Sequence, residues 1–232
     1  MGLTDEAIVK IRDLIVSGQL QPGAKLPPEK ELCAQLGMSR SSMREAVKAL
    51  EVARVLDVRH GDGTYVTSLE PRLLLEGIGF AVDLLRDDTV LEVLEVRRML
   101  EPEATALAAL RIDDATLVTL REHLDHMREA GDDAEALVAA DAAFHQCVIS
   151  ACGNQTLVSV LNGLSRRTLR ARVWRGIVQD EAIRVTVEQH AAIYEALVAR
   201  DPQLARAAAL LHVATSERGL RVALSSTADD ES

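Results

Sequence analysis

The stretch LPPEKELCAQLGMSRSSMREAVKALEVARVLDVRHGDGTYV, residues 26–66, decides the fold of the first part of the chain. It contains a helix opened by proline, a glycine turn, and a second helix that begins after Ser39. Two extended segments follow and flank the turn HGDG at residues 60–63, whose glycines permit a tight hairpin. An amphipathic helix precedes the stretch, with apolar side chains at Ile8, Ile11, Leu14 and Ile15. This order of elements predicts a winged helix-turn-helix unit.

The second helix of this unit separates cationic from apolar side chains. At about 100° per residue, one side carries Arg40, Ser41, Arg44 and Lys48. The opposite side carries Met43, Ala46, Val47 and Leu50. The apolar side can pack on a core, and guanidinium groups on the other side can pair with guanine edges in the major groove of DNA. A cationic helix face alone is more often a solvated surface, but the order of the surrounding elements favours DNA recognition.

Further side chains of the same unit are candidates for contacts with the DNA backbone. Hydroxyl groups at the start of the second helix can donate to phosphates, together with the helix N-terminus. They belong to Ser39, Ser41 and Ser42, of which Ser39 is also the expected N-cap. Lys30 on the preceding helix can reach the backbone, and His60 at the hairpin tip can enter the minor groove or contact phosphate.

The segment GQLQPGAKLPPEKELCAQLGMSRSSMREAVKAL, residues 18–50, resembles the GntR family of bacterial regulators, and the likeness extends over nearly all of residues 8–67. In the FadR-like branch of that family, the positions held here by Lys30, Arg40, Arg44 and His60 contact operator DNA. The chain departs from the family at Arg54, where a glycine usually stops the recognition helix in the left-handed conformation.

Length and composition favour two domains in a cytoplasmic protein. The 232 residues are 48% apolar, which is enough for two cores. We expect a DNA-binding domain at residues 1–68, an all-α domain at 69–224 and a disordered tail at 225–232. No apolar run approaches the roughly 20 residues of a membrane span, and the N-terminus lacks the layout of a signal peptide. The cysteines Cys33, Cys147 and Cys152 form no metal-binding spacing and are expected to be reduced.

The net charge of −10 is confined to the second part of the chain. Residues 1–68 hold nine of the 26 basic and nine of the 36 acidic residues. The first domain is therefore neutral overall and positive only on its reading face. An acidic body behind that face should limit non-specific binding to DNA.

Beyond residue 68 the pattern is helical throughout, so the fold is expected to be mainly α, with the winged unit followed by a bundle of about seven helices. Turn residues separate helices expected at 71–86, 89–111, 114–130, 134–152, 155–175, 180–200 and 202–223. Pro102 lies inside the second of these and is expected to kink it.

Four side chains in this second part have the chemistry of metal ligands. Asp141 and His145 are four residues apart and share the apolar side of one helix with Leu137, Val148 and Cys152. His190 and His212 lie among apolar or small residues on two later helices. A buried carboxylate must be paired or coordinated, and this donor set suits one divalent ion per chain, such as Zn, Ni or Mn. The alternative is a set of hydrogen-bonded core histidines. His123 and His126, among charged neighbours, are expected to be solvated.

The second part is similar to the all-α FCD effector-binding domain of FadR-like GntR regulators. The segments DAAFH, EQHAAIYEAL and LLHVA match its metal-binding pattern, which implies that Asp141, His145, His190 and His212 are the ligands. The segment EVRRMLEPEATALAAL resembles a helix whose arginine, here Arg97, faces the pocket. A guanidinium beside the metal would hold a small organic acid. The alternative is that Arg97 only pairs with Glu101. Weaker candidates are Arg166, Arg170 and Arg172.

The sequence therefore predicts a homodimeric, ligand-responsive transcription factor that is not an enzyme and is expected to be a repressor. One alternative is a metal sensor, in which the ion itself is the signal. Another is a helical metalloenzyme with an accessory DNA-binding unit, since such ligands can activate water. No general base is identified beside the four ligands, which disfavours the enzyme.

Overall fold

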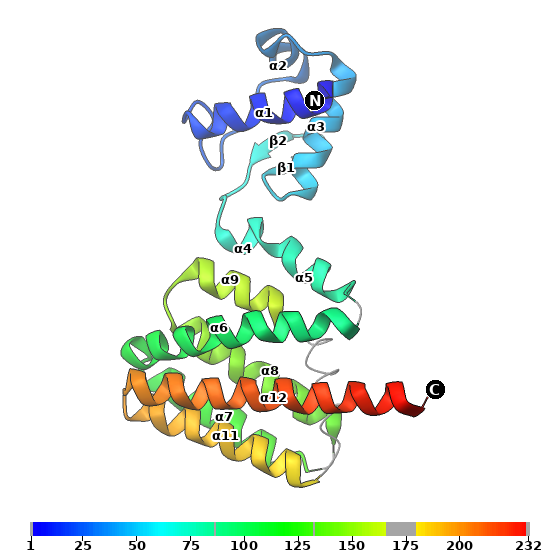
Figure 1. Cartoon of the computed structure of the whole chain (residues 1–232). Coiled ribbons are helices and arrows are strands. Elements are labelled where there is room, and N and C mark those ends of the chain that lie inside the picture. The colour runs from blue at the N-terminus through cyan, green and yellow to red at the C-terminus, as the bar shows by residue number, and fades with distance from the viewer. Residues whose placement is uncertain (1, 86, 132, 166–179, 231–232) are drawn as a thin grey trace. The chain divides into compact units, whose positions relative to one another are not determined.

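The computed structural model describes residues 2–85, 87–131, 133–165 and 180–230. The chain divides into two compact units, Met1–Gly77 and Ile78–Ser232. The fold is mainly α, as predicted, and a two-stranded antiparallel sheet lies in the first unit (Figure 1). The domain boundary expected after residue 68 remains a prediction. No helix among the described residues is long and apolar enough to cross a membrane.

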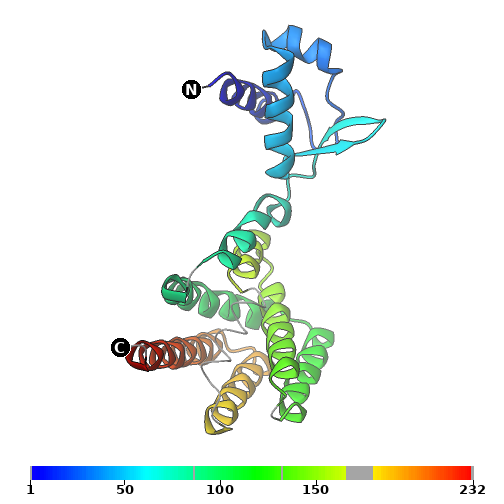
Figure 2. The same ribbon diagram turned by 90° about the vertical axis from the view of Figure 1, so that its right-hand side faces the viewer.

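The first unit has the element order of a winged helix-turn-helix. Its elements are α1 (Leu3–Val16), α2 (Glu29–Leu36), α3 (Arg40–Val52), β1 (Leu56–Arg59), β2 (Gly63–Val66) and α4 (Pro71–Leu74). Gly37 ends α2 in the left-handed conformation, with φ of 65°. Ser39 caps α3 by accepting a hydrogen bond from the backbone N–H of Ser42, as expected. Ile11, Leu32 and Met43 form the centre of its core, and α2 crosses the beginning of α3 in Figure 2.

The hairpin of this unit gains a third extended segment from the chain before α2. β1 pairs with β2 in antiparallel register from Leu56 opposite Val66 to Arg59 opposite Gly63. Lys25 forms a bridge with Tyr65, and the Leu26 N–H donates to the Thr64 carbonyl at 2.8 Å. The sequence pattern did not indicate this pairing. It ties the hairpin to the segment that leads into α2.

The exit from α3 uses an arginine where the family usually has glycine. Arg54 adopts the left-handed conformation with φ of 59°. Its carbonyl accepts a hydrogen bond from Thr67 Oγ1 at 2.7 Å, and its Nε lies 2.8 Å from Glu76 Oε2. The chain therefore keeps the turn that glycine would make, at the cost of backbone strain.

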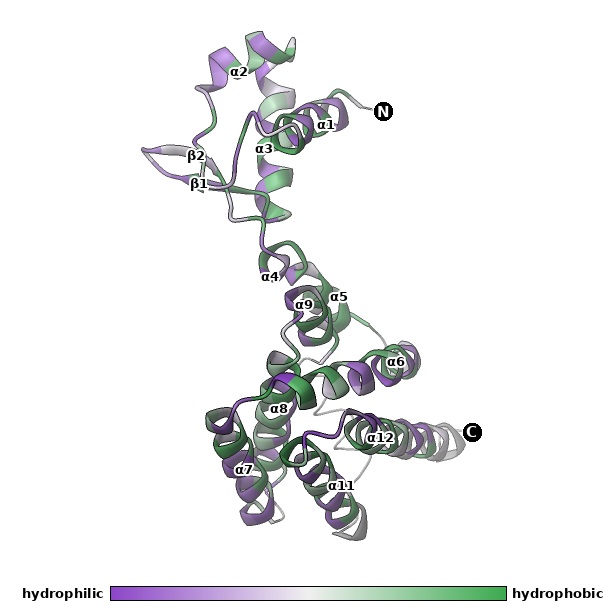
Figure 3. Ribbon diagram, turned by 90° about the vertical axis from the view of Figure 1, so that its left-hand side faces the viewer, coloured by the Kyte–Doolittle hydropathy of each residue, from purple (hydrophilic) through white to green (hydrophobic). Residues whose placement is uncertain are grey.

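The second unit is a helical bundle. Its helices are α6 (Asp87–Arg111), α7 (Asp114–Glu129), α8 (Ala134–Ala151), α9 (Gln155–Leu164), α11 (Asp180–Val198) and α12 (Pro202–Asp230), preceded by α5 (Glu76–Asp83). α6 packs along α12, α7 along α8 and α11 along α12. Leu94, Leu124, Phe144 and Leu197 lie in its core. In Figure 3, α8 is mostly green, which marks apolar residues, whereas α7 carries more purple. This difference agrees with burial, since more residues are buried in α8 than in α7.

Three of the expected helices differ from the structure by more than two residues. The helix expected at 71–86 is interrupted at Leu75, where the backbone leaves the helical conformation (φ −100°, ψ 5°) and separates α4 from α5. The helix expected at 155–175 ends at Leu164, because the backbone of Ser165 leaves the helical conformation (φ −111°, ψ 33°), and residues 166–175 lie outside the described residues. α12 extends to Asp230, beyond residue 223, so the segment expected to be disordered is helical up to that point. Pro102 lies inside α6 without ending it.

Candidate functional site

The predicted reading face of α3 is exposed to solvent. Arg40, Ser41, Arg44 and Lys48 are all exposed, and so are Lys30 on α2 and His60 at the hairpin tip. Met43, Ala46 and Leu50 are buried on the other side of α3. Ser42 differs from its neighbours because it is only 7% exposed and its hydroxyl lies 2.9 Å from Ser39 Oγ. Its side chain completes the helix cap instead of facing outward.

Carboxylates accompany several cations of this surface. Arg44 Nε donates to Glu29 Oε2 at 2.8 Å, and Lys48 Nζ lies 3.1 Å from Glu45 Oε1. On the hairpin, Asp62 accepts hydrogen bonds from Lys25 Nζ at 3.0 Å and from the hydroxyl of Tyr65 at 2.8 Å. The Lys25 ammonium, followed by the Tyr65 hydroxyl, holds the pKa of the Asp62 carboxyl below its usual value. Sequence reasoning did not identify these partners. The pairs of Arg44 with Glu29 and of Lys25 with Asp62 join segments that are far apart in the sequence.

A groove lies between α3 and the hairpin. Its volume is about 790 Å³, and α2, α3, the hairpin and the segment before α2 all line it. Its wall contains the charged side chains Lys25, Glu29, Arg44, Lys48, Glu51 and Asp62, together with His60. Both predicted contact elements, the recognition helix and the wing, therefore open onto one surface, on which cations and carboxylates alternate.

The second unit brings the four predicted metal ligands together. Asp141 and His145 lie on α8, His190 on α11 and His212 on α12. All four are buried, and one ligand atom from each lies within 4.8 Å of the other three. Nε2 of His145 is 3.1 Å from Nε2 of both His190 and His212. Asp141 Oδ1 is 3.1 Å from Nε2 of His190 and 3.6 Å from Nε2 of His145.

These separations fit a shared metal ion. Ligand atoms that lie about 2.1 Å from one ion are separated by about 3.0 to 3.4 Å in common geometries, close to the four separations given above, and the whole set lies within 4.8 Å. Nδ1 of His190 lies 2.7 Å from the carbonyl oxygen of Thr186, which can only accept a hydrogen bond, so Nδ1 carries a proton. With Nδ1 occupied in this way, Nε2 is the nitrogen of His190 that faces Asp141 and His145. A metal ion between these groups would use that nitrogen as a ligand, and the contact to Thr186 would orient the ring.

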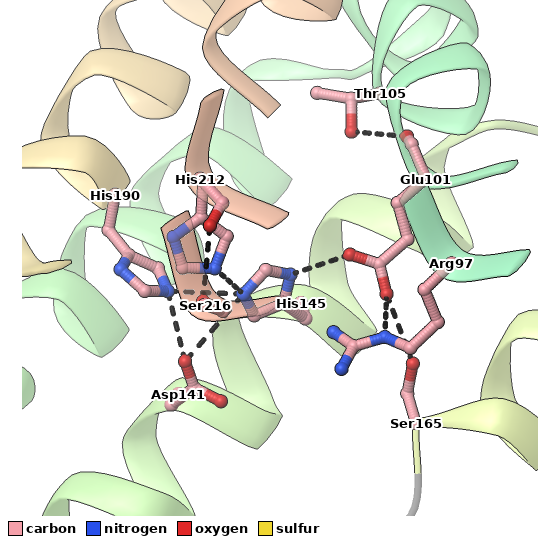
Figure 4. A network of polar contacts seen from close by, with 9 residues as sticks. All are labelled: Arg97, Glu101, Thr105, Asp141, His145, Ser165, His190, His212 and Ser216. Atoms are coloured by element: carbon pink, nitrogen blue, oxygen red, sulfur yellow. Dashed lines mark hydrogen bonds and ion pairs between the residues drawn. The ribbon is translucent and has the colours of Figure 1, made fainter. Parts of the chain in front are cut away.

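A buried ion pair lies on the Nδ1 side of His145, away from His190 (Figure 4). Arg97 Nε donates to Glu101 Oε1 at 2.6 Å, and the two side chains are 4% and 3% exposed. Glu101 Oε2 lies 3.8 Å from Nδ1 of His145, and Ser165 Oγ donates to Glu101 Oε1 at 3.2 Å. The pairing considered as the alternative for Arg97 is therefore present. Arg97 is also part of the contact network that reaches a predicted ligand.

Other candidates lie away from this network or outside the described residues. His126 is exposed and His123 is partly buried, and burial lowers the pKa of His123. Arg166, Arg170 and Arg172 lie outside the described residues. Sequence reasoning did not single out Thr186, although it lies four residues before His190. That spacing alone is too common to identify a partner.

Known protein families match both units of the chain. The bacterial regulatory proteins, gntR family, match residues 3–66, and the FCD domain matches residues 92–215. The HTH-type transcriptional regulator LutR of Bacillus subtilis is 30% identical over 209 residues, covering 88% of this chain and 94% of the relative. The galactonate operon transcriptional repressor of Escherichia coli is 29% identical over 227 residues, with 95% and 98% covered. The structure of Streptococcus agalactiae GntR has a TM-score of 0.64 at 27% identity and covers 93% of this chain and 99% of its own.

A winged helix-turn-helix unit followed by an FCD domain defines a DNA-binding transcriptional regulator. The chain belongs to the GntR family of bacterial regulatory proteins. Its relatives are transcriptional regulators and not enzymes, which removes the alternative of a metalloenzyme.

Proposed function

We propose that this regulator is a homodimer that binds an inverted repeat and responds to a small organic acid bound at a metal centre. The observation that carries the proposal is the convergence of Asp141 and three histidines in the unit that follows the DNA-binding unit. We assign DNA binding to residues 1–68, effector binding and dimerisation to residues 69–224, and a cytoplasmic location to the protein.

On the DNA side, Arg40 and Arg44 would read base edges from the major groove, because both are exposed on the same face of α3. Lys30, Ser39, Ser41 and His60 would contact the backbone or the minor groove. Ser42 would act through the helix cap, since its side chain is buried. One recognition helix reads only a few base pairs, so a two-fold dimer and a palindromic site are expected.

On the effector side, one divalent ion per chain, such as Zn, Ni or Mn, would be held by Asp141, His145, His190 and His212. When bound, the ion would supply a Lewis-acidic centre for a carboxylate oxygen. Arg97 supports the choice of an acid, because Glu101 occupies its Nε and leaves the terminal nitrogens to bind a second carboxylate. One relative is named for galactonate, a carboxylate, and is a repressor. Another relative is the Glc operon transcriptional activator, so the names of the relatives include both roles, and the role proposed for this chain is repression.

The test begins with recovery of the operator by binding selection. A thermal-shift screen of hydroxy, sugar and dicarboxylic acids with metal-loaded protein then supplies ligands for DNA-binding assays. An effector with typical coupling should lower operator affinity by about five- to 150-fold. Arg97→Lys should lose the response, because lysine keeps the charge opposite Glu101 but lacks the planar fork. If every acid that binds the protein leaves its operator affinity unchanged, the proposal of an acid-responsive regulator is contradicted.

The second candidate is the metal sensor, which the buried ligand set also supports. Metal titration without an organic ligand separates the two. A sensor predicts that the ion alone changes operator affinity, whereas the acid-responsive regulator predicts a change only when the acid is added to loaded protein.

A further inference from the structure

The DNA-facing surface carries a carboxylate that attraction to phosphates does not explain. Glu29 is the first residue of α2, and its Oε2 accepts a hydrogen bond from Arg44 Nε at 2.8 Å. The side chains are 36% and 66% exposed, so the pair lies at the surface. A negative charge there weakens attraction to DNA. Its position against Arg44 therefore needs another physical reason.

The geometry of the pair leaves one edge of Arg44 available. A guanidinium has five N–H groups in a fixed fork. Glu29 accepts from the Nε edge, and among the described residues Arg44 makes no second side-chain hydrogen bond. The terminal nitrogens can thus still donate two parallel hydrogen bonds to guanine O6 and N7. The ion pair restricts the direction of the side chain without using the groups that would contact a base.

Glu29 lies on α2, whereas Arg44 lies on α3, so the ion pair holds the Arg44 side chain from a neighbouring helix. Leu32 and Cys33 of α2 and Met43 of α3 are buried in the same core, and the glycine turn between the helices is short. A free arginine loses considerable rotamer freedom when it is immobilised at an interface. An arginine already held from a neighbouring helix loses less of that freedom on binding.

Glu29 remains ionised under ordinary conditions. The hydrogen bond from Arg44 is the main reason that the pKa of the Glu29 carboxyl is lowered, and Arg40 adds a smaller Coulombic contribution. Glu31 offers a comparison, because it is an exposed carboxylate on the same helix and makes no ion pair among the described residues.

We infer that Glu29 is a positioning residue for base recognition, which holds Arg44 by Nε so that its terminal nitrogens are presented to a guanine edge. The carboxylate also opposes binding to phosphates, but it does so on any sequence, so only the positioning of Arg44 favours the operator over other DNA. This inference rests on the proposed function, in which Arg44 reads bases. It predicts that Glu29 contributes to sequence preference without touching DNA.

The experiment compares Glu29→Ala with Glu31→Ala in the full-length protein, using the selected operator, operators with single base changes, and random DNA at one salt concentration. Both variants remove one negative charge from α2, so both should bind random DNA more tightly. Only Glu29→Ala should reduce the ratio of operator to random affinity, by about two- to fivefold per half-site, the range expected for an exposed ion pair. Its loss of preference should fall on the base position that Arg44→Ala also affects.

Two further variants separate the outcomes. Glu29→Gln keeps an acceptor for Nε and should retain more of the preference than Glu29→Ala. In an Arg44→Ala background, Glu29→Ala should leave the ratio unchanged. Equal ratios for Glu29→Ala and Glu31→Ala, with Arg44→Ala impaired, would overturn the inference alone. Full preference in Arg44→Ala would overturn the assignment of α3 to the major groove, and the inference with it.

Discussion

Removal of one partner from the buried pair of Arg97 and Glu101 should strongly destabilise the second unit. The side chains are 4% and 3% exposed, and Nε lies 2.6 Å from Oε1. Arg97→Ala would leave the Glu101 carboxylate buried with only the hydroxyl of Ser165 as a side-chain donor at that oxygen. The loss of one partner from a buried ion pair typically costs about 3 to 5 kcal/mol. We expect a loss of that size in the free energy of unfolding.

A double-mutant cycle tests this reasoning by urea unfolding of metal-loaded, full-length protein. The double variant Arg97→Met with Glu101→Met replaces both charges by apolar side chains of similar length, so it should cost much less than Arg97→Ala alone. The cycle of Arg97→Met, Glu101→Met and the double variant should then give a favourable coupling energy for the wild-type pair. A loss below about 1 kcal/mol for Arg97→Ala, or additive effects in the cycle, would refute the argument from burial.

Three further perturbations test local features. Arg54→Gly should be about 1 kcal/mol more stable than Arg54→Ala in urea unfolding, because both variants lose the contact with Glu76 and only glycine takes a φ of 59° without strain; equal stabilities would contradict this. Hydrogen bonding by Thr116 lowers the pKa of the Asp113 carboxyl, so its stabilisation of the α7 N-terminus is present above the unfolded-state pKa and is lost as pH falls through the lower, folded-state pKa. Asp113→Asn should make hydrogen exchange in that first turn less dependent on acidification, and an unchanged dependence would exclude this cap as its cause. Gly63→Ala should loosen the hairpin by about 1 to 3 kcal/mol, because φ is 148° there, and unaltered exchange of the Leu26 amide, which donates to the Thr64 carbonyl, would argue against it.

Local patterns predicted much of the first unit because its signals are short in range. The cap at Ser39, the left-handed turn at Gly37 and the apolar side of α3 each depend on neighbours within a few residues. The third extended segment could not be predicted in this way, since Lys25 and Tyr65 are far apart in the sequence. The substitution at Arg54 is visible in the sequence, but its left-handed backbone is visible only in the structure.

For the second unit, the spacing of apolar residues predicted which side chains are buried better than it predicted which side chains contact each other. The apolar sides of three helices place Asp141, His145, His190 and His212 inward, and all four are buried. Their convergence depends on how α8, α11 and α12 cross, which no single-helix pattern specifies. Glu101 could be paired with Arg97 from their spacing of four residues. Its position beside His145 depends instead on the packing of α6 against α8.

The metal content of the protein tests the central claim most directly. Elemental analysis is applied to the protein purified without chelators and to protein reconstituted with Zn, Ni or Mn. The variant His190→Ala and the control variant His126→Ala are treated in the same way, since the His126 side chain is exposed. We predict about one ion per chain in the wild type and in His126→Ala, and a marked loss in His190→Ala, because His190 is fully buried and contributes one of the converging ligand atoms. No bound metal in the wild type after reconstitution, or equal metal content in all three proteins, would contradict the proposed metal centre.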